Sequence, residues 1–350
     1  MEKQGVSGIR IAMVYIGTVV GAGFATGQEI LQFFVNFGLG GLGGIALSTV
    51  LFVFYGVLIM RLGMAVGAAS HREILPKLGG PAFQTGMDAL ILVSLFGALT
   101  AMLAGTGALF GQELGLSPVL GSAIMGVLTA LTVLGGLKGV IRAISAVVPF
   151  LLVSVVGICV FVLLEGASIT PGVGRPEAVA PTGLMGNWVW AAVLYGSYNI
   201  LMSAAVLAPL GAAAADRRAV FRGGALGGIG LGAASVMIYL ALTAGRGDVG
   251  SLEVPILYLA GRISPLAGAL FTLVLIAEIY TTAVGALYGF SARLMGARPT
   301  LLILGTTAAA FLASLFGFYN LVRYLYPLQG YGGIVFLVAL AVSRIVVRRR

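Results

Sequence analysis

A glycine-rich stretch inside the first long apolar segment constrains this sequence more than any other feature. Residues 17–27 include four glycines in eleven positions: Gly17, Gly21, Gly23 and Gly27. The lipid interior has no water to pair with an exposed amide or carbonyl, so a spanning helix can unwind only where its freed backbone groups line a cavity or meet a ligand. Glycine at this density weakens a helix, and interrupted helices form the midplane binding sites of secondary transporters. The stretch therefore predicts a broken first span that contributes to a binding site.

The composition predicts a polytopic membrane protein. Of the 350 residues, 59% are hydrophobic and only 9% are charged, and the mean hydropathy is +1.09, whereas a soluble domain has roughly 25% charged residues. One cysteine and one histidine exclude a disulfide framework and argue against a histidine-ligated metal site. The phosphate-binding pattern GxxxxGK[ST] is absent from the sequence, which argues against an ATP-driven pump. We expect no enzyme, no cofactor and no metal other than a coupling Na⁺.

Ten apolar runs are long enough, at about 20 residues each, to cross a bilayer. They cover residues 10–34, 39–62, 83–111, 117–137, 140–164, 187–210, 220–244, 264–292, 300–318 and 320–344. With a cytoplasmic N-terminus, all but four of the 20 Lys and Arg residues fall on the inner side; the exceptions are Arg175, Arg246, Arg262 and Arg323. This distribution follows the positive-inside rule. It predicts a bacterial inner-membrane protein with both termini in the cytoplasm. The net charge of +9 is then explained by membrane orientation and contact with lipid headgroups rather than by nucleic-acid binding.

The longest hydrophilic interruption, residues 165–186, divides the spans five and five. It predicts an extracellular loop between a first five-helix repeat, residues 1–164, and a second, residues 187–350, within one transmembrane domain. Five is an odd number, so the second half enters from the opposite side and any repeat is inverted. The sixth span, which opens the second half, carries Tyr195-Gly196-Ser197-Tyr198-Asn199 near its middle. Each half therefore opens with a helix that we expect to be interrupted. We also expect a short amphipathic helix over residues 252–262.

The predicted break in span 1 supplies two kinds of backbone group. Amides freed at Gly21, Ala22 and Gly23 would lie at the positive end of the following half-helix, where they can bind a carboxylate. Carbonyls freed at Gly17 and Val20 can face a sodium ion. The alternative is that these glycines only allow helices to pack closely.

Span 8 carries a second group of polar residues on one helical face. Glu278, Thr281 and Thr282 lie at positions i, i+3 and i+4. The two hydroxyls suit a weakly bound sodium ion, although threonines in helices also commonly bond to their own backbone. An acid inside the membrane is a functional candidate by default. Glu278 is thus a candidate proton carrier or a counter-ion for a cationic substrate, and the alternative is a structural pair with an arginine.

Three further predictions concern polar side chains. The middle of span 6 offers hydrogen-bonding groups for a small polar substrate: Tyr195, Ser197, Tyr198 and Asn199. Glu29 and Arg323 are candidates for a pair that closes the outer vestibule, or else are two solvated residues at a cavity mouth. Asp88, near the cytoplasmic end of span 3, is expected to pair with a loop arginine or lysine.

The run Gly17-x-x-Val20-Gly21-Ala22-Gly23-Phe24 resembles the first-helix signature of the amino acid–polyamine–organocation superfamily. The longer string from Gly21 to Glu29 is similar to the bacterial YkvI-like permeases of that clan. The resemblance implies the five-plus-five inverted-repeat fold of LeuT, with spans 1, 2, 6 and 7 as a moving bundle against spans 3, 4, 8 and 9. It implies sodium ligation by the carbonyls of Gly17 and Val20 and the hydroxyls of Thr281 and Thr282, and substrate binding by residues 21–24. Glu278 departs from the pattern, which leaves sodium and proton coupling as alternatives.

These observations predict an all-α membrane protein of ten transmembrane helices, with broken helices 1 and 6. We expect a secondary transporter that imports a small amino acid or related solute by cation-coupled alternating access, as a monomer or homodimer in the bilayer. One alternative is a proton-coupled or organic-cation carrier that uses Glu278. Another is an amino-acid sensor of the same fold, which would be expected to carry partner domains or long soluble tails.

Overall fold

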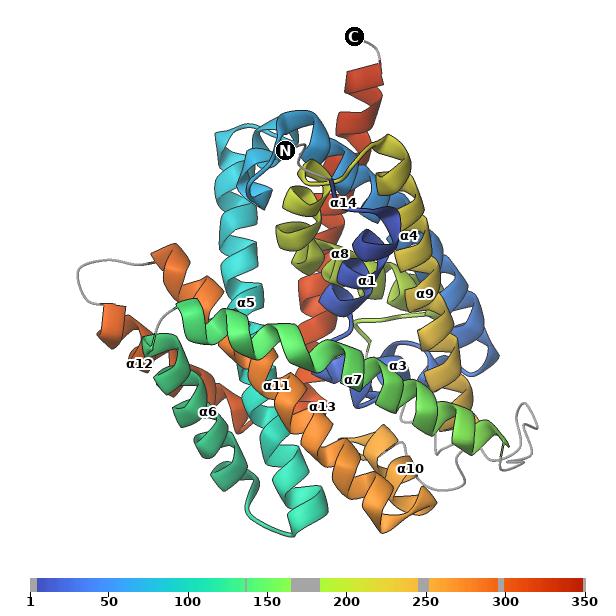
Figure 1. Ribbon diagram of the computed structural model, residues 1–350, viewed down its shortest axis with the longest axis vertical. Coiled ribbons are helices and arrows are strands. Elements are labelled where there is room, and N and C mark those ends of the chain that lie inside the picture. Colours follow the sequence, from blue (N-terminus) through green and yellow to red (C-terminus); the bar gives the residue numbers. More distant parts are fainter. Residues whose placement is uncertain (1–4, 136, 165–182, 245–251, 295–298, 349–350) are drawn as a thin grey trace.

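The computed structural model describes residues 5–135, 137–164, 183–244, 252–294 and 299–348. Apart from an isolated bridge between Val6 and Ala214, the regular structure in these ranges is helical. Figure 1 shows the arrangement of its longer helices. They are α1 (Gly8–Val19), α2 (Ala22–Ala25), α3 (Gln28–Phe33), α4 (Leu39–Val66), α5 (Pro81–Leu114), α6 (Pro118–Leu134), α7 (Leu137–Leu164), α8 (Trp188–Ala212), α9 (Arg217–Ala244), α10 (Pro255–Ile263), α11 (Pro265–Leu294), α12 (Pro299–Ser314), α13 (Phe318–Asn320) and α14 (Tyr326–Arg348). A π-helical turn, η5 (Leu321–Leu325), joins α13 to α14.

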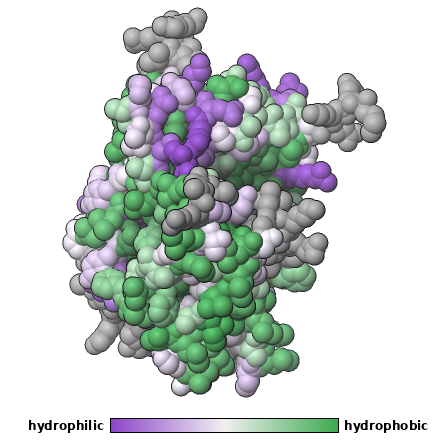
Figure 2. All heavy atoms as spheres, turned by 90° about the vertical axis from the view of Figure 1, so that its left-hand side faces the viewer, coloured by the Kyte–Doolittle hydropathy of each residue, from purple (hydrophilic) through white to green (hydrophobic). Residues whose placement is uncertain are grey.

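The helices coincide with the predicted apolar runs, and the prediction of an all-helical, multi-pass membrane protein is confirmed. Six are long and apolar enough to cross a bilayer, α7 has 28 residues, and the other three spans correspond to the shorter apolar helices α1, α6 and α12. The shortest of these is α1, with 12 residues, because the first span is interrupted and continues as α2 and α3. Much of the face in Figure 2 is hydrophobic, with hydrophilic side chains gathered toward its upper end. This is the end at which both chain termini lie in Figure 1.

The spans pack in two groups. In the first, α8 and α9 pack against α4, and α1 packs against α9. In the second, α5 contacts α6, α11 and α12. Figure 1 shows α7 running obliquely across the molecule, and it contacts both α9 and α11. These groups correspond to spans 1, 2, 6 and 7 and to spans 3, 4, 8 and 9, as the resemblance implies; motion between them stays a prediction.

Two glycines bring α4 and α8 into backbone contact. A Cβ on Gly63 would overlap the carbonyl oxygen of Ala208, and a Cβ on Gly211 would overlap the carbonyl oxygen of Met60. The two helices therefore meet without intervening side chains. Such small-residue contacts are a common means of close helix packing in membranes.

The predicted pairing of Asp88 is confirmed. Its carboxylate accepts a hydrogen bond from Arg293 Nη2 at 2.6 Å and lies 3.7 Å from Arg72 Nε. Arg72 belongs to the connection between α4 and α5, whereas Arg293 ends α11. The ion pair therefore links this connection to two helices of the second packing group.

The predicted amphipathic segment also forms, as α10. Its residues Pro255, Ile256, Leu257, Leu259 and Ala260 are buried. Most of the predicted extracellular loop, residues 165–182, lies outside the described residues. The division of the chain into two inverted repeats stays a prediction.

Candidate functional site

The first span is interrupted at the predicted position. Val20 and Gly21 adopt extended backbone conformations, with ψ of 100° and −172°. α1 therefore ends at Val19, and α2 starts at Ala22 as a separate helix. Helix ends leave amides and carbonyls without intrahelical partners, so the break presents backbone groups of both kinds. Gly21 is partly exposed, and no atom lies within 4 Å of the position that its Cβ would occupy.

A second interruption follows six residues later and separates α2 from α3. Gly27 has a φ of +80°, a left-handed conformation that favours glycine. The side chain of Thr26 accepts a hydrogen bond from the Gln28 amide at 3.3 Å and donates one to the Gly23 carbonyl at 2.9 Å. The Ile256 amide at the start of α10 donates to the Thr26 carbonyl at 3.0 Å. The double break was not predicted, although Thr26-Gly27 is a turn-forming pair that the sequence displays.

Glu29 lies buried in the first turn of α3, with 5% of its surface exposed. Its Oε2 atom accepts a hydrogen bond from the Tyr198 hydroxyl on α8. Its Oε1 atom lies where a Cβ of residue 23 would be, so Gly23 leaves the space that the carboxylate fills. The acid thus joins the interrupted first span to α8.

Aromatic rings surround this hydrogen bond. The Tyr198 ring centroid lies 5.2 Å from that of Tyr326 and 5.8 Å from that of Phe33. Tyr195 extends the cluster, with its ring 5.3 Å from Phe33 and 5.7 Å from Tyr198. Tyr326 was not predicted to take part, because the expected partner of Glu29 in the last span was Arg323.

Two glutamines beside Glu29 are buried and poorly satisfied. Gln28 is fully buried, and neither its Nε2 nor its Oε1 atom has a hydrogen-bond partner. Gln32 Nε2 is also unpaired, while its Oε1 accepts a long hydrogen bond of 3.5 Å from Asn36. Buried polar groups are normally paired with protein or water. Their number here marks α3 as a polar segment within the protein interior.

The prediction of a broken sixth span is wrong. α8 runs without interruption from Trp188 to Ala212 and includes Tyr195 and Asn199. A single glycine, Gly196, lies in this segment, and it packs against Leu51 of α4. The helix is therefore maintained through a close contact rather than unwound.

The polar side chains of α8 are also placed differently from the prediction. Ser197 Oγ donates to the Gly330 carbonyl of α14 at 2.7 Å and approaches the Leu194 carbonyl at 2.9 Å. Asn199 Nδ2 donates to the Tyr195 carbonyl at 3.1 Å. The Ser197 hydroxyl and the Asn199 amide nitrogen are therefore bonded to backbone carbonyls. Of the four predicted residues, Tyr198 and Tyr195 lie with Glu29, and Tyr198 bonds to it.

Glu278 and its two threonines form a compact group on α11, which packs against α2. Glu278 is buried, with 3% of its surface exposed, and its Oε2 atom has no partner. Thr281 Oγ1 donates to the Glu278 carbonyl at 3.0 Å, and Thr282 Oγ1 lies 3.5 Å from Glu278 Oε1. The structural alternative of an arginine partner is not realised, since both ion pairs among the described residues involve Asp88.

The predicted pair between Glu29 and Arg323 is not formed in this structure. Arg323 Nη1 donates to the Tyr319 hydroxyl at 3.0 Å, and the guanidinium lies over the rings of Tyr319 and Tyr324. Glu29 faces α8 instead and is bound by Tyr198. A gating role for the two residues stays a prediction.

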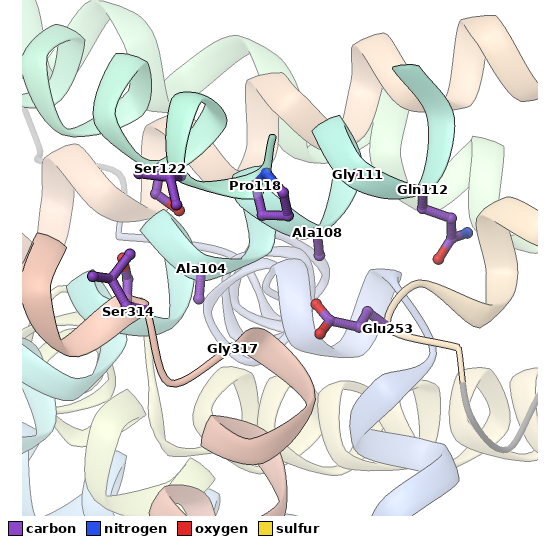
Figure 3. A pocket seen from close by; sticks show the side chains of 11 residues that line it. Ala104, Ala108, Gly111, Gln112, Pro118, Ser122, Glu253, Ser314 and Gly317 are labelled. Carbon is purple, nitrogen blue, oxygen red and sulfur yellow. The ribbon is translucent and has the colours of Figure 1, made fainter. Parts of the chain in front are cut away.

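A cavity of about 350 Å³ lies elsewhere, between the ends of α5, α6 and α12. Figure 3 shows the side chains of Glu253, Gln112 and Ser122 around it. The Gln112 side chain donates a hydrogen bond to the Val254 carbonyl and accepts one from the Val254 amide, each at 3.2 Å. None of the predicted site residues lines this cavity, so it is separate from the interrupted span.

Comparison with known proteins relates the chain to two membrane proteins of Bacillus subtilis. It is 29% identical to the uncharacterized membrane protein YkvI over 352 residues, which cover 100% of this chain and 99% of YkvI. The chain is thus similar to YkvI over its whole length. It is also 27% identical to the uncharacterized protein YyaD, over 95% of this chain and 96% of YyaD. No protein-family model matches the chain.

Solved structures support the LeuT-type fold of this chain. The inward-facing conformation of Mhp1 has a TM-score of 0.65 at 17% identity, over 99% of this chain and 78% of Mhp1. A manganese transporter of Eremococcus coleocola has a TM-score of 0.60 at 14% identity, over 96% of this chain and 76% of its own. A Na⁺-coupled sialic acid symporter has a TM-score of 0.58 at 13% identity, over 96% of this chain and 79% of its own.

Proposed function

We propose that the chain is a secondary transporter that moves a small organic solute across the membrane by cation-coupled alternating access. The observation that carries this proposal is the interruption of the first span at Val20–Gly21, in a protein interior that also holds two buried acids. Unwound backbone at membrane depth is tolerated where it lines a cavity or binds a ligand. Glu29 lies against Gly23, and Glu278 lies on α11, which packs against α2.

The solute is proposed to be a small amino acid or a related amine, and the direction is import. The structural neighbours include Mhp1 with a bound bromovinylhydantoin, a manganese transporter and a sialic acid symporter, so the common fold alone does not select a substrate. No group of three or more His, Cys, Asp or Glu side chains suited to a metal ion occurs among the described residues. The residues at the break therefore favour an organic solute over a transition-metal ion.

Sodium is the proposed coupling ion. It would lie between spans 1 and 8, held by the carbonyls of Gly17 and Val20 and the hydroxyls of Thr281 and Thr282. The negative end of α1 favours a cation at this place, and the unpaired Oε2 atom of Glu278 adds a charged oxygen. The alternative is a proton carried by Glu278, which would need no sodium.

Alternating access is proposed to occur between the two packing groups. One consists of α1, α4, α8 and α9, and the other of α5, α6, α11 and α12. A cation held between α1 and α11 would contact both groups. It can therefore favour one conformation through its differential affinity.

Solute flux into proteoliposomes tests the proposal. Vesicles with an inward sodium gradient should accumulate labelled glycine or a competing small amine, and unlabelled solute trapped inside should accelerate exchange. A proton gradient that replaces sodium completely would select the proton-coupled alternative. Saturable binding without flux under either gradient would overturn the transporter proposal and favour a sensor.

A further inference from the structure

Two buried carboxylates, Glu29 and Glu278, have no cationic partner among the described residues. The ion pairs of the described residues are those of Asp88 with Arg72 and Arg293. Glu29 is bonded by the neutral Tyr198 hydroxyl, and Glu278 is approached by the neutral Thr282 hydroxyl. A buried charge without a partner is costly. Neither acid therefore has a cationic partner among the described side chains, so a proton or a bound cation would balance it.

The environments of the two acids differ. Glu278 lies among hydroxyl and carbonyl oxygens, the ligand set of a small inorganic cation. Glu29 instead accepts a hydrogen bond from Tyr198, and the centroid of the Tyr198 ring lies 5.2 Å from that of Tyr326 and 5.8 Å from that of Phe33. Faces of aromatic rings attract organic cations. An ammonium group can combine this attraction with a charge-assisted hydrogen bond to a carboxylate.

We propose that Glu29 is the residue that binds the ammonium group of the transported solute, within the ring cluster of Tyr198, Tyr326 and Phe33. This inference rests on the proposed transport function and deepens it by naming the substrate class: solutes that carry an amine. The Tyr198 hydroxyl orients the carboxylate through Oε2, and Oε1 is directed toward Gly23 and the interrupted span. Glu278 then serves the coupling cation.

The same geometry determines where an acidic group of the solute can lie. A carboxylate placed at Gly23 would meet Glu29 Oε1, which occupies the adjacent space. Like charges in a buried site repel strongly, and such repulsion is an effective means of rejecting a ligand. The space beside Gly21 is open. The site can therefore accept an amine alone or an amine with a carboxylate at Gly21, and it rejects a solute with a carboxylate alone.

Thermal stability of the purified protein with three small probes tests this inference. Ethylamine carries only the amine, glycine carries both groups, and acetate carries only the carboxylate. Ethylamine and glycine at millimolar concentrations should raise the melting temperature, and acetate should not. Glu29→Gln should weaken ethylamine binding by about tenfold or more, while stabilisation by sodium persists. Glu278→Gln should show the reverse pattern.

Two more conservative variants test the same inference if Glu29→Gln does not fold. Tyr198→Phe retains the ring but removes the hydrogen bond that orients Glu29, and Glu29→Asp retains the charge but moves it. Both variants should weaken ethylamine binding. The control for the loss of one acidic side chain is Glu113→Gln at the exposed end of α5, which should leave ethylamine binding unchanged.

Stabilisation by acetate equal to that by ethylamine would overturn the inference, and so would the absence of any effect of the amines. Amine binding unchanged in Glu29→Gln would also overturn it. The transport proposal is separate, since it fails only if reconstituted protein gives no coupled flux of any solute.

Discussion

The Tyr198 hydroxyl donates a hydrogen bond to Glu29 and so joins residues that are 169 positions apart in the sequence. The bond connects α3, which continues the interrupted first span, to the uninterrupted α8. Both side chains are 5% exposed. A change in the position of α3 relative to α8 must therefore break or move a hydrogen bond that water does not readily replace.

Gly23 should be required for the position of Glu29. In Gly23→Ala the new methyl group would overlap Oε1, and because that atom ends a flexible side chain, the carboxylate should shift while the fold is retained. Stabilisation by ethylamine should be lost. Gly305→Ala on α12, outside the proposed site, is the matched control, since its Cβ would meet no atom within 4 Å. Equal stabilisation of the two variants by ethylamine would show that Oε1 need not occupy this space.

Sodium-dependent stabilisation should depend on the threonine pair of α11. In Thr281→Ala/Thr282→Ala the two hydroxyl oxygens are removed from the face that carries Glu278, and we expect the melting temperature to become independent of sodium with folding retained. Thr306→Ala/Thr307→Ala is the control, because these adjacent threonines are also buried and Thr307 likewise bonds to its own helix. An undiminished sodium effect in the first double variant would remove the assignment.

The contact between α4 and α8 should tolerate no added methyl group. Gly63→Ala places a Cβ against the Ala208 carbonyl, and overpacking of this kind costs about 1–3 kcal/mol. Gly305→Ala on α12 has open space and should be neutral or stabilising by up to about 1 kcal/mol. Melting temperatures in one detergent compare the two. A Gly63→Ala protein as stable as wild type would contradict backbone contact.

Glu253, between α9 and α10, should make stability depend on pH. Burial raises the pKa of its carboxyl above the usual value, and a backbone hydrogen bond from Phe318 acts in the opposite direction. A raised pKa in the folded state gives stability at low pH that is lost as the pH rises through that pKa. Glu253→Gln should therefore stabilise the protein at pH above the raised value and have a smaller effect near the ordinary glutamate pKa of about 4.3. Melting temperatures of both proteins across this range, with Glu113→Gln as the control, measure the difference; a constant offset at all pH values would contradict the linkage.

The sequence predicted the features that depend on local chemistry. Long apolar runs determine the span positions because the bilayer requires about 20 apolar residues per crossing, and the glycines around residue 21 weaken the helix where it breaks. The pairing of Asp88 also followed from its place near basic loop residues. Apart from Arg293, which is 205 positions from Asp88, the determining groups lie close together in the sequence or are common to every membrane helix.

Features that depend on distant partners could not be predicted. The partner of Glu29 comes from α8 rather than from Arg323, because the side that α3 presents to each neighbour is determined by packing. The helix at Tyr195–Asn199 is preserved by its contacts with α4 and α14, where Gly196 meets Leu51 and Ser197 meets Gly330. A glycine beside polar residues looks the same in a sequence whether it loosens a helix or accommodates a neighbour.

The continuity of α8 has a consequence for how substrate preference can diverge among relatives of this chain. An unbroken helix uses its own amides and carbonyls internally, so α8 can contact a solute only through side chains, whereas the first span also offers main-chain groups that no substitution removes. A single exchange at Tyr195 or Tyr198 can then alter the wall of the site without disturbing the helix that carries it. The proposed site would thus combine a fixed half, formed by the backbone of the first span, with an adjustable half that point mutations can change one residue at a time.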